Sequence, residues 1–111
     1  ENIMNNKFTY TFLGNQYVLE IYKTSYINNG NLAISAVISE TQESFDILTV
    51  NVDDLPYGMA CLDTNNLPGI YEALMEAGLI YETGFTMKSG FNTYPVALFN
   101  VDELPELEVQ N

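Results

Sequence analysis

The sequence predicts an α+β fold in which one antiparallel sheet of about five to six strands carries a single helix on one face. Three observations support this fold class: strand-like segments in the N-terminal half, one helical segment after them, and one or two strand-like segments near the C-terminal end. The hydrophobic share of 47% in 111 residues is large enough for one buried core. We therefore expect a single domain.

The N-terminal half predicts a four-stranded antiparallel meander. Aromatic residues alternate with threonines between Phe8 and Phe12, which is typical of a strand with one buried face. The pair Gly14-Asn15 is suited to the tight hairpin turn that follows. Segments of high β propensity then predict the return strand and two more strands, at 16–23, 32–38 and 45–52.

One segment, 61–79, has the features of a helix. The run 63–66 supplies capping oxygens, Pro68 suits the first turn, and Gly78 suits the exit. Apolar residues recur at helical spacing, so they predict the face that packs on the sheet. That face holds Leu67, Ile70, Tyr71, Leu74 and Ala77 or Gly78, whereas Glu72 and Glu76 lie outside it.

Three shorter segments complete the predicted sheet and its ends. Residues 59–62 suggest a brief strand, 79–83 another, and 91–99 end in a clear strand, with Pro95 favouring an edge position or a strand start. Between the last two, residues 85–90 fit either strand or loop. We expect the folded domain to span 7–100. Residues 1–6 are expected to be disordered or not native to the protein, and 101–111 to form an acidic tail.

Charge is the most unusual property of the sequence. Fifteen acidic residues face three lysines, with no arginine and no histidine, and the formal net charge is −12. Binding of free nucleic acid or of an anionic membrane is therefore disfavoured, because both need clustered cations. The acidity fits a partner protein with a basic surface, although solubility alone also favours net charge.

The residues that usually carry chemistry are scarce. Without histidine the chain lacks the commonest general base and zinc ligand, and Cys61 cannot form a Cys–His pair. We therefore predict no enzymatic activity, no catalytic residues, no cofactor and no metal. The run 63–66 could offer oxygen ligands to a metal, but capping is the favoured interpretation. A single cysteine fits a reducing, cytoplasmic location.

A partner-binding surface is the remaining candidate site. Exposed acids on strands, loops and the helix are its expected members, and Tyr22 joins them because it lies on the strand face opposite the apolar residues. A clustered ridge of these acids would support binding, whereas scattered acids would not. The candidates are Glu20, Tyr22, Asp46, Asp53, Asp54, Glu72 and Glu76.

Four phrases occur in an order that resembles a known family. They are Tyr26-x-Asn-Asn-Gly-x-Leu-Ala-Ile34, Leu48-Thr-Val-Asn51, Asp63-Thr-Asn-Asn66 and Ser89-Gly-Phe-x-Thr-Tyr-Pro95. Together they resemble short bacterial proteins known only as a domain of unknown function and common on conjugative and phage-like elements of gut bacteria. The resemblance covers about Phe8 to Phe99, and Asn92 stands where many relatives carry cysteine. It implies no catalytic residues, but it implies an accessory protein that inhibits host defence or serves conjugation.

Three functions follow as hypotheses. The first is a non-enzymatic protein that binds a basic protein surface, in its sharpest form an inhibitor of a nucleic-acid-binding defence enzyme. The second is a small enzyme or metal-binding module that uses Asp63 and neighbouring carboxylates. The third is a structural module that dimerises through a sheet edge or through a surface of exposed tyrosines. The sequence does not determine the oligomeric state.

Overall fold

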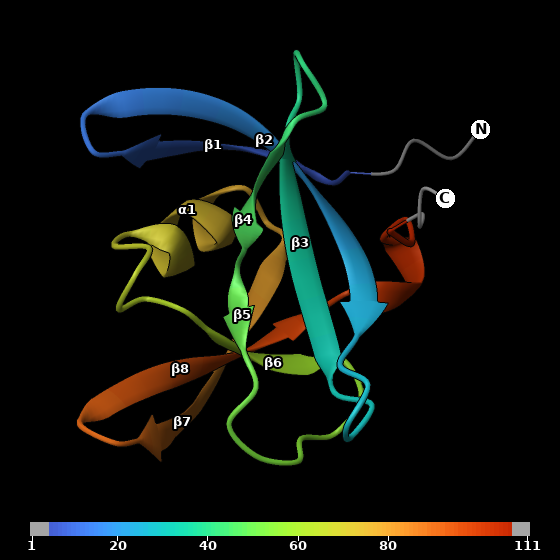
Figure 1. Cartoon of the computed structure of the whole chain (residues 1–111), viewed down its shortest axis with the longest axis vertical. Helices are drawn as coiled ribbons and strands as arrows, with labels where there is room; N and C mark the ends of the chain where they lie inside the picture. The colour runs from blue at the N-terminus through green and yellow to red at the C-terminus, as the bar shows by residue number, and fades with distance from the viewer. Residues whose placement is uncertain (1–4, 108–111) are drawn as a thin grey trace.

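The computed structural model describes residues 5–107 and confirms the α+β class. Its strands form two four-stranded sheets, so the expectation of one sheet of five to six strands is wrong (Figure 1). The first sheet has the order β1-β2-β3-β4, with bounds Lys7–Phe12, Asn15–Ser25, Leu32–Ile38 and Ser44–Ile47. The second has the order β5-β6-β8-β7, with bounds Thr49–Val50, Met59–Leu62, Asn92–Phe99 and Ile80–Ser89.

The division into two sheets occurs at Leu48. The sequence predicts one strand over 45–52, but the chain leaves the first sheet after β4 and joins the second as β5. Leu48 is completely buried, its N–H donates to the Ile34 carbonyl, and its carbonyl accepts from the Asp63 N–H. The continuous β-branched pattern hides this change because both halves remain extended. Leu48 therefore connects the two sheets through their common core.

The turn of the first hairpin lies one residue earlier than the sequence suggests, because Asn15 belongs to the return strand. Register runs from Lys7 opposite Glu20 to Phe12 opposite Asn15, which leaves Leu13 and Gly14 as the two turn residues. Both have positive φ, 52° and 82°, as a two-residue hairpin of the favoured twist requires. Leu13 lies in a conformation that costs a non-glycine residue free energy. The tight turn places β1 in exact register with β2 along its whole length.

The second sheet contains a longer hairpin than expected. The sequence leaves the segment 79–90 divided between strand and loop, but its residues Ile80–Ser89 form the single strand β7. Its register with β8 shifts between Glu82 and Thr86, and Gly84 there has a φ of 78°. A β-bulge with glycine at its left-handed position explains why the alternating pattern breaks in mid-strand. Pro95 lies in β8, opposite Thr86. Since β8 is an inner strand of its sheet, the edge position that Pro95 favoured is wrong. On its other side, the pairing of β8 with β6 stops at Val96, the residue after Pro95.

The helix α1 (Ile70–Glu76) lies between the sheets and contacts β1 of one and β7 of the other (Figure 1). The prediction that it covers one face of a single sheet is therefore wrong. Its buried side, with Ile70 and Leu74, joins the main core that both sheets share. Periodicity correctly places these residues inside and Glu72 and Glu76 outside. A seven-residue helix depends on such packing, since it is too short to persist alone.

The predicted capping role of 63–66 is also wrong for this helix. The helix begins after Gly69, whose φ is 80°, and no side chain caps it. Asp63 closes the preceding turn: its Oδ1 accepts from the Asn66 N–H at 3.3 Å, and its Oδ2 accepts from the Asn66 Nδ2 at 3.0 Å. Pro68 likewise precedes the helix. The polar residues 63–66 thus mark the turn that precedes the helix, and the packing of Ile70 and Leu74 in the core determines where the helix begins.

The segment after β8 is attached to the domain as far as the structure describes it. A short 3-10 helix, Val101–Glu103, follows β8, and Val101 and Leu104 are buried in the main core. Lys23 of β2 forms hydrogen bonds with the residues that follow. Its backbone N–H donates to the Pro105 carbonyl, and its carbonyl accepts from the Leu107 N–H. Its side-chain Nζ donates to the Val101 carbonyl at 2.6 Å. The described part of the predicted acidic tail, 101–107, therefore packs on β2. Residues 1–4 and 108–111 lie outside the described part.

Within residues 5–107, no helix reaches the length and apolar character needed to cross a membrane.

Candidate functional site

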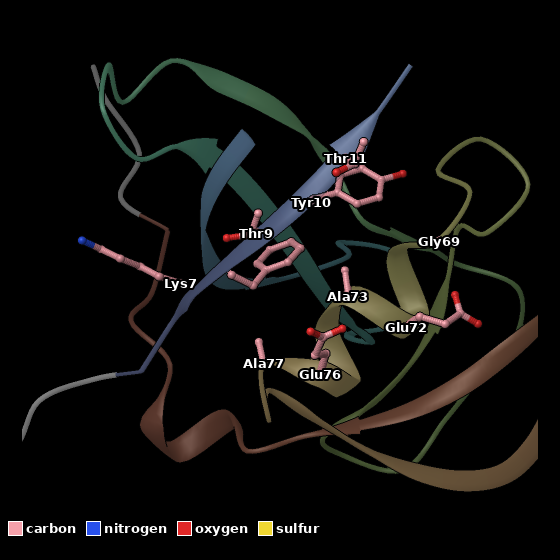
Figure 2. Close-up of a pocket in the computed structure, with 10 residues that line it drawn as sticks. Lys7, Thr9, Tyr10, Thr11, Gly69, Glu72, Ala73, Glu76 and Ala77 are labelled. Atoms are coloured by element: carbon pink, nitrogen blue, oxygen red, sulfur yellow. The ribbon is translucent and has the colours of Figure 1, made fainter. Parts of the chain in front are cut away.

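A groove lies on the surface between strand β1 and helix α1 (Figure 2). Its volume is about 630 Å³. One wall is the strand and the other is a single face of the helix. The strand contributes Lys7, Phe8, Thr9, Tyr10 and Thr11. The helix and its two flanking residues contribute Gly69, Glu72, Ala73, Glu76 and Ala77.

Strand β1 forms its wall of the groove because alternation fixes which side chains face the core. Phe8 and Tyr10 are buried, whereas Lys7, Thr9 and Thr11 are exposed. The Tyr10 hydroxyl donates to the Pro68 carbonyl at 2.8 Å and so ties the strand to the residues just before the helix. This bond and the shared core hold the two walls at a fixed separation.

Helix α1 forms the opposite wall with small and acidic side chains. Gly69, Ala73 and Ala77 recur every four residues, which places them on one face. Glu72 and Glu76 stand beside them with exposed side chains. Figure 2 shows the walls running in opposite directions, with Lys7 towards Ala77 and Thr11 towards Gly69. The small residues leave space, and the glutamates supply negative charge.

The groove lies in an acidic part of the surface. Burial raises the pKa of the Tyr71 hydroxyl, and the carboxylates of Glu82 and Glu72 raise it further. Burial likewise raises the pKa of Tyr10, with a smaller contribution from Asp46. Because a phenolate is disfavoured near negative charge, the smaller contributions place Glu82 and Glu72 within electrostatic range of Tyr71, and Asp46 within range of Tyr10. Lys7 is the one cation among the residues that line the groove.

The predicted partner-binding residues do not form one ridge. Glu72 and Glu76 line the groove, and Asp46 lies on β4 within electrostatic range of Tyr10. Asp53 and Asp54 lie elsewhere, in the loop between β5 and β6. Alternation along β1 was visible in the sequence, but no local signal indicated that a helix would face its edge.

Glu20 and Tyr22 are engaged with their own neighbours. The Tyr22 hydroxyl donates to Glu20 Oε1 at 2.9 Å, and the Ser39 hydroxyl donates to Oε2 at 2.7 Å. Lys7 Nζ lies 3.8 Å from Oε2, and the Glu20 side chain is only 13% exposed. These contacts give Glu20 a structural role on the outer face of the first sheet.

We expect this Glu20 cluster to contribute to acid stability. The Ser39 hydrogen bond, followed by that of Tyr22, lowers the pKa of Glu20 from its ordinary value of 4.5. A carboxyl with a lowered folded-state pKa stabilises the fold above its ordinary value, and the contribution is lost as pH falls through the lowered one. Glu20→Gln should therefore reduce the free energy of unfolding at pH 7, and the difference from wild type should shrink on acidification.

Urea denaturation at a series of pH values, monitored by circular dichroism, measures this difference. Glu40→Gln, at an exposed turn position, is the control and should not reproduce the trend. A deficit in Glu20→Gln that stays constant from neutral to acid pH would contradict the assignment.

A cluster of asparagines is the second candidate, and it joins two loops. Asn31 is buried, its Nδ2 donates to Asn51 Oδ1 at 2.9 Å and to the Asp53 carbonyl at 2.7 Å, and its Oδ1 accepts from the Leu55 N–H at 3.2 Å. These bonds link the β2–β3 loop to the β5–β6 loop, and thus one sheet to the other. The sequence leaves residues 24–31 between two predicted strands, but it does not indicate this connection.

The outer part of the asparagine cluster completes the network. Asn51 Nδ2 donates to Asn28 Oδ1 at 3.0 Å and to Asn29 Oδ1 at 3.2 Å, and Asn29 Nδ2 donates to Asp54 Oδ1 at 3.2 Å. Across residues 5–107, every buried side-chain nitrogen and oxygen has a hydrogen-bond partner. The buried amide of Asn31 thus has its hydrogen-bond partners within the protein, which favours a structural role for the cluster.

The residues considered for chemistry are occupied or buried. Asp63 accepts two hydrogen bonds from Asn66, and within the described range no three acidic or cysteine side chains gather as a metal site would require. Cys61 is fully buried in a small core cluster, and burial raises the pKa of its thiol. A protonated buried thiol is a poor nucleophile. The groove is therefore the best-formed candidate site.

Comparisons with known proteins assign a family. Neither the curated proteins nor the solved structures contain a match to this chain. The sequence model of a family described as a domain of unknown function, DUF4313, matches residues 18–111. The match contains helix α1 and begins within β2, so the helical wall of the groove lies inside it and β1 precedes it. Since the match covers most of the 111 residues, the chain belongs to the DUF4313 family.

Proposed function

We propose that this protein is a non-enzymatic binding protein that takes a basic segment of a partner protein into the β1–α1 groove. The observation that carries the proposal is the groove itself, in which Glu72 and Glu76 stand over a wall of small residues. Carboxylates at the rim of a hollow attract cationic side chains and orient them on approach. The net charge of −12 extends this attraction beyond the groove.

The proposal favours a long basic side chain as the bound group. Gly69, Ala73 and Ala77 leave room along the helix for aliphatic stems, while Glu72 and Glu76 can pair with the charged heads. Lys7 lies at one end of the groove and already pairs with Glu20. It therefore leaves the two glutamates as the dominant charge in the groove.

Charge reversal tests the proposal. A short, fluorescently labelled peptide of alternating lysine and threonine should bind the wild-type chain at low salt, as measured by fluorescence anisotropy. Glu72→Lys combined with Glu76→Lys should weaken binding by about tenfold or more, because two attractive pairs become repulsive. Raising the salt concentration should weaken wild-type binding, since exposed pairs are screened.

The matched control is Glu40→Lys combined with Glu43→Lys, which makes the same change of net charge in the exposed loop between β3 and β4. This control should keep most of the wild-type affinity. Equal loss in both double variants would show that net charge, and not the groove, determines binding. Failure of the peptide to bind the wild-type chain would reject the groove as a site for basic segments.

The narrower form of the proposal concerns the partner. We propose a cytoplasmic accessory protein of a bacterial mobile element that occupies the basic groove of a nucleic-acid-binding defence enzyme. The sequence resemblance and the acidity support it, and the buried free thiol of Cys61 fits a reducing compartment. The same charge-reversed variant tests it in cells: wild type, but not the variant, should raise transformation by a plasmid that a restriction or CRISPR system targets.

A further inference from the structure

Within residues 5–107, no strand pairs with the outer edge of β1, so this edge has unused hydrogen-bonding capacity. Strand β1 ends the first sheet, and the Asn6 carbonyl accepts from the Ile21 N–H at 2.8 Å. Because bonding to one neighbour alternates along an antiparallel strand, Phe8, Tyr10 and Phe12 continue this ladder with β2. The N–H and C=O groups of the intervening residues, Lys7, Thr9 and Thr11, therefore point away from β2.

The groove follows this edge. Five consecutive residues of β1, from Lys7 to Thr11, line it, and consecutive residues alternate between the two faces of a sheet. A hollow over one face would contact only every second residue. The groove consequently runs along the side of the strand, where the outward-pointing backbone groups lie.

The two walls have matching lengths. Four residue steps from Lys7 to Thr11 span about 13 Å in a strand. Eight steps from Gly69 to Ala77 span about 12 Å at helical rise. Figure 2 shows them side by side and opposed in direction. The groove between these two walls is therefore about as long as a peptide of four to five residues in extended conformation.

Strand β1 is the most regular sheet edge in the described part of the chain. It pairs over six residues without a shift in register. The edge strand β5 has two residues, and register shifts interrupt the pairing of β4 and of β7. Short or bulged edges resist pairing with another chain, whereas a regular edge with β-branched residues such as Thr9 and Thr11 favours it.

We propose that the groove binds its partner by strand addition: an extended basic segment of another protein pairs with the free edge of β1 and faces α1. This inference rests on the proposed function and specifies its mode. Main-chain bonds to a sheet edge provide affinity, and alternate side chains provide specificity. Side chains on one side of the added strand would meet Ala73 and Ala77 and reach Glu72 and Glu76.

The arrangement selects the pattern of the bound segment. Alternate residues must be basic to place cations along the helix, and the residues between them face the exposed threonine side of the sheet. A second copy of this chain is disfavoured as occupant, because pairing two β1 edges would bring two acidic helices together. Net charges of −12 on both copies would add to that repulsion.

Backbone N-methylation tests strand addition with the native protein. Two versions of the alternating lysine–threonine peptide carry methyl groups on the lysine amides or on the threonine amides, with the same net charge. Since only one alternate set faces β1, we expect one version to bind about tenfold or more weakly and the other to bind like the parent. If both bind as tightly as the parent, strand addition is wrong, while charge-dependent binding in the groove stands.

Two variants at Thr9 test the same backbone hydrogen bond on the protein side. Thr9→Pro removes an N–H that points into the groove and leaves the β1–β2 ladder complete, as proline on a sheet edge permits. Thr9→Val keeps the N–H and removes the hydroxyl. We expect Thr9→Pro to lose about tenfold or more in affinity and Thr9→Val to change it little. Equal affinities for both variants would overturn the inference.

Two outcomes separate the inference from its alternatives. Failure of the unmethylated peptide to bind would reject the proposed function and strand addition together. Sedimentation that shows a wild-type dimer, dissociated by Thr9→Pro, would assign the edge to a second copy and overturn the inference. If Thr9→Pro does not fold by circular dichroism, the methylated peptides alone decide, because they leave the protein unchanged.

Discussion

Replacing Leu48 with alanine is expected to lower the free energy of unfolding by about 3 kcal/mol, within the roughly 2–5 kcal/mol typical of fully buried leucines. Leu48 is completely buried where the chain passes from the first sheet to the second. Its backbone bonds to Ile34 and Asp63 would remain, so the loss reports the side chain alone. Urea denaturation measured by circular dichroism gives the difference.

The neighbouring residue provides the control for this prediction. Ile47→Ala removes an aliphatic side chain that is 49% exposed, and it should cost well under half as much. A loss in Leu48→Ala that is no larger than the loss in Ile47→Ala would contradict the view that Leu48 holds the two sheets on one core. Unchanged steepness of the urea transition would show that unfolding stays a single step.

Replacing Asn31 with alanine is expected to lower the free energy of unfolding by about 2–3 kcal/mol, because it removes three partly buried hydrogen bonds that each contribute about 1 kcal/mol. The partners are Asn51 Oδ1, the Asp53 carbonyl and the Leu55 N–H. These bonds join the loops of the two sheets, so their loss should loosen the β2–β3 loop first. Urea denaturation and amide hydrogen exchange at residues 26–31 measure both effects.

An exposed asparagine distinguishes the network from a general effect of the substitution. Asn65→Ala removes the same amide group from an exposed turn position and should change stability by less than about 0.5 kcal/mol. Comparable losses at positions 31 and 65 would show that the network contributes little to linking the sheets. Faster exchange that spares the β2–β3 loop would also contradict its assigned role.

The groove illustrates how far sequence could go towards the site. Helical periodicity placed Glu72 and Glu76 on the outer face of the helix, and the structure agrees. The same list of acids included Glu20, whose carboxylate receives hydrogen bonds from Ser39 and Tyr22. Whether a carboxylate is hydrogen-bonded within the fold depends on neighbours from other strands, which periodicity does not reveal. The position of β1 opposite the helix was missed for the same reason, because it depends on contacts between distant segments.

By itself, the sequence determined the α+β class, the alternation in β1 and β2, the single helix with its buried face, and the strong negative charge. All four are local or compositional properties, since alternation, helical spacing and charge are carried by residues near one another in the chain. The tertiary structure alone decided three others: the division at Leu48 into two sheets, the start of the helix after Gly69, and the opposition of β1 and α1 across a groove. These depend on contacts between distant segments, where burial of a shared core outweighs local preference.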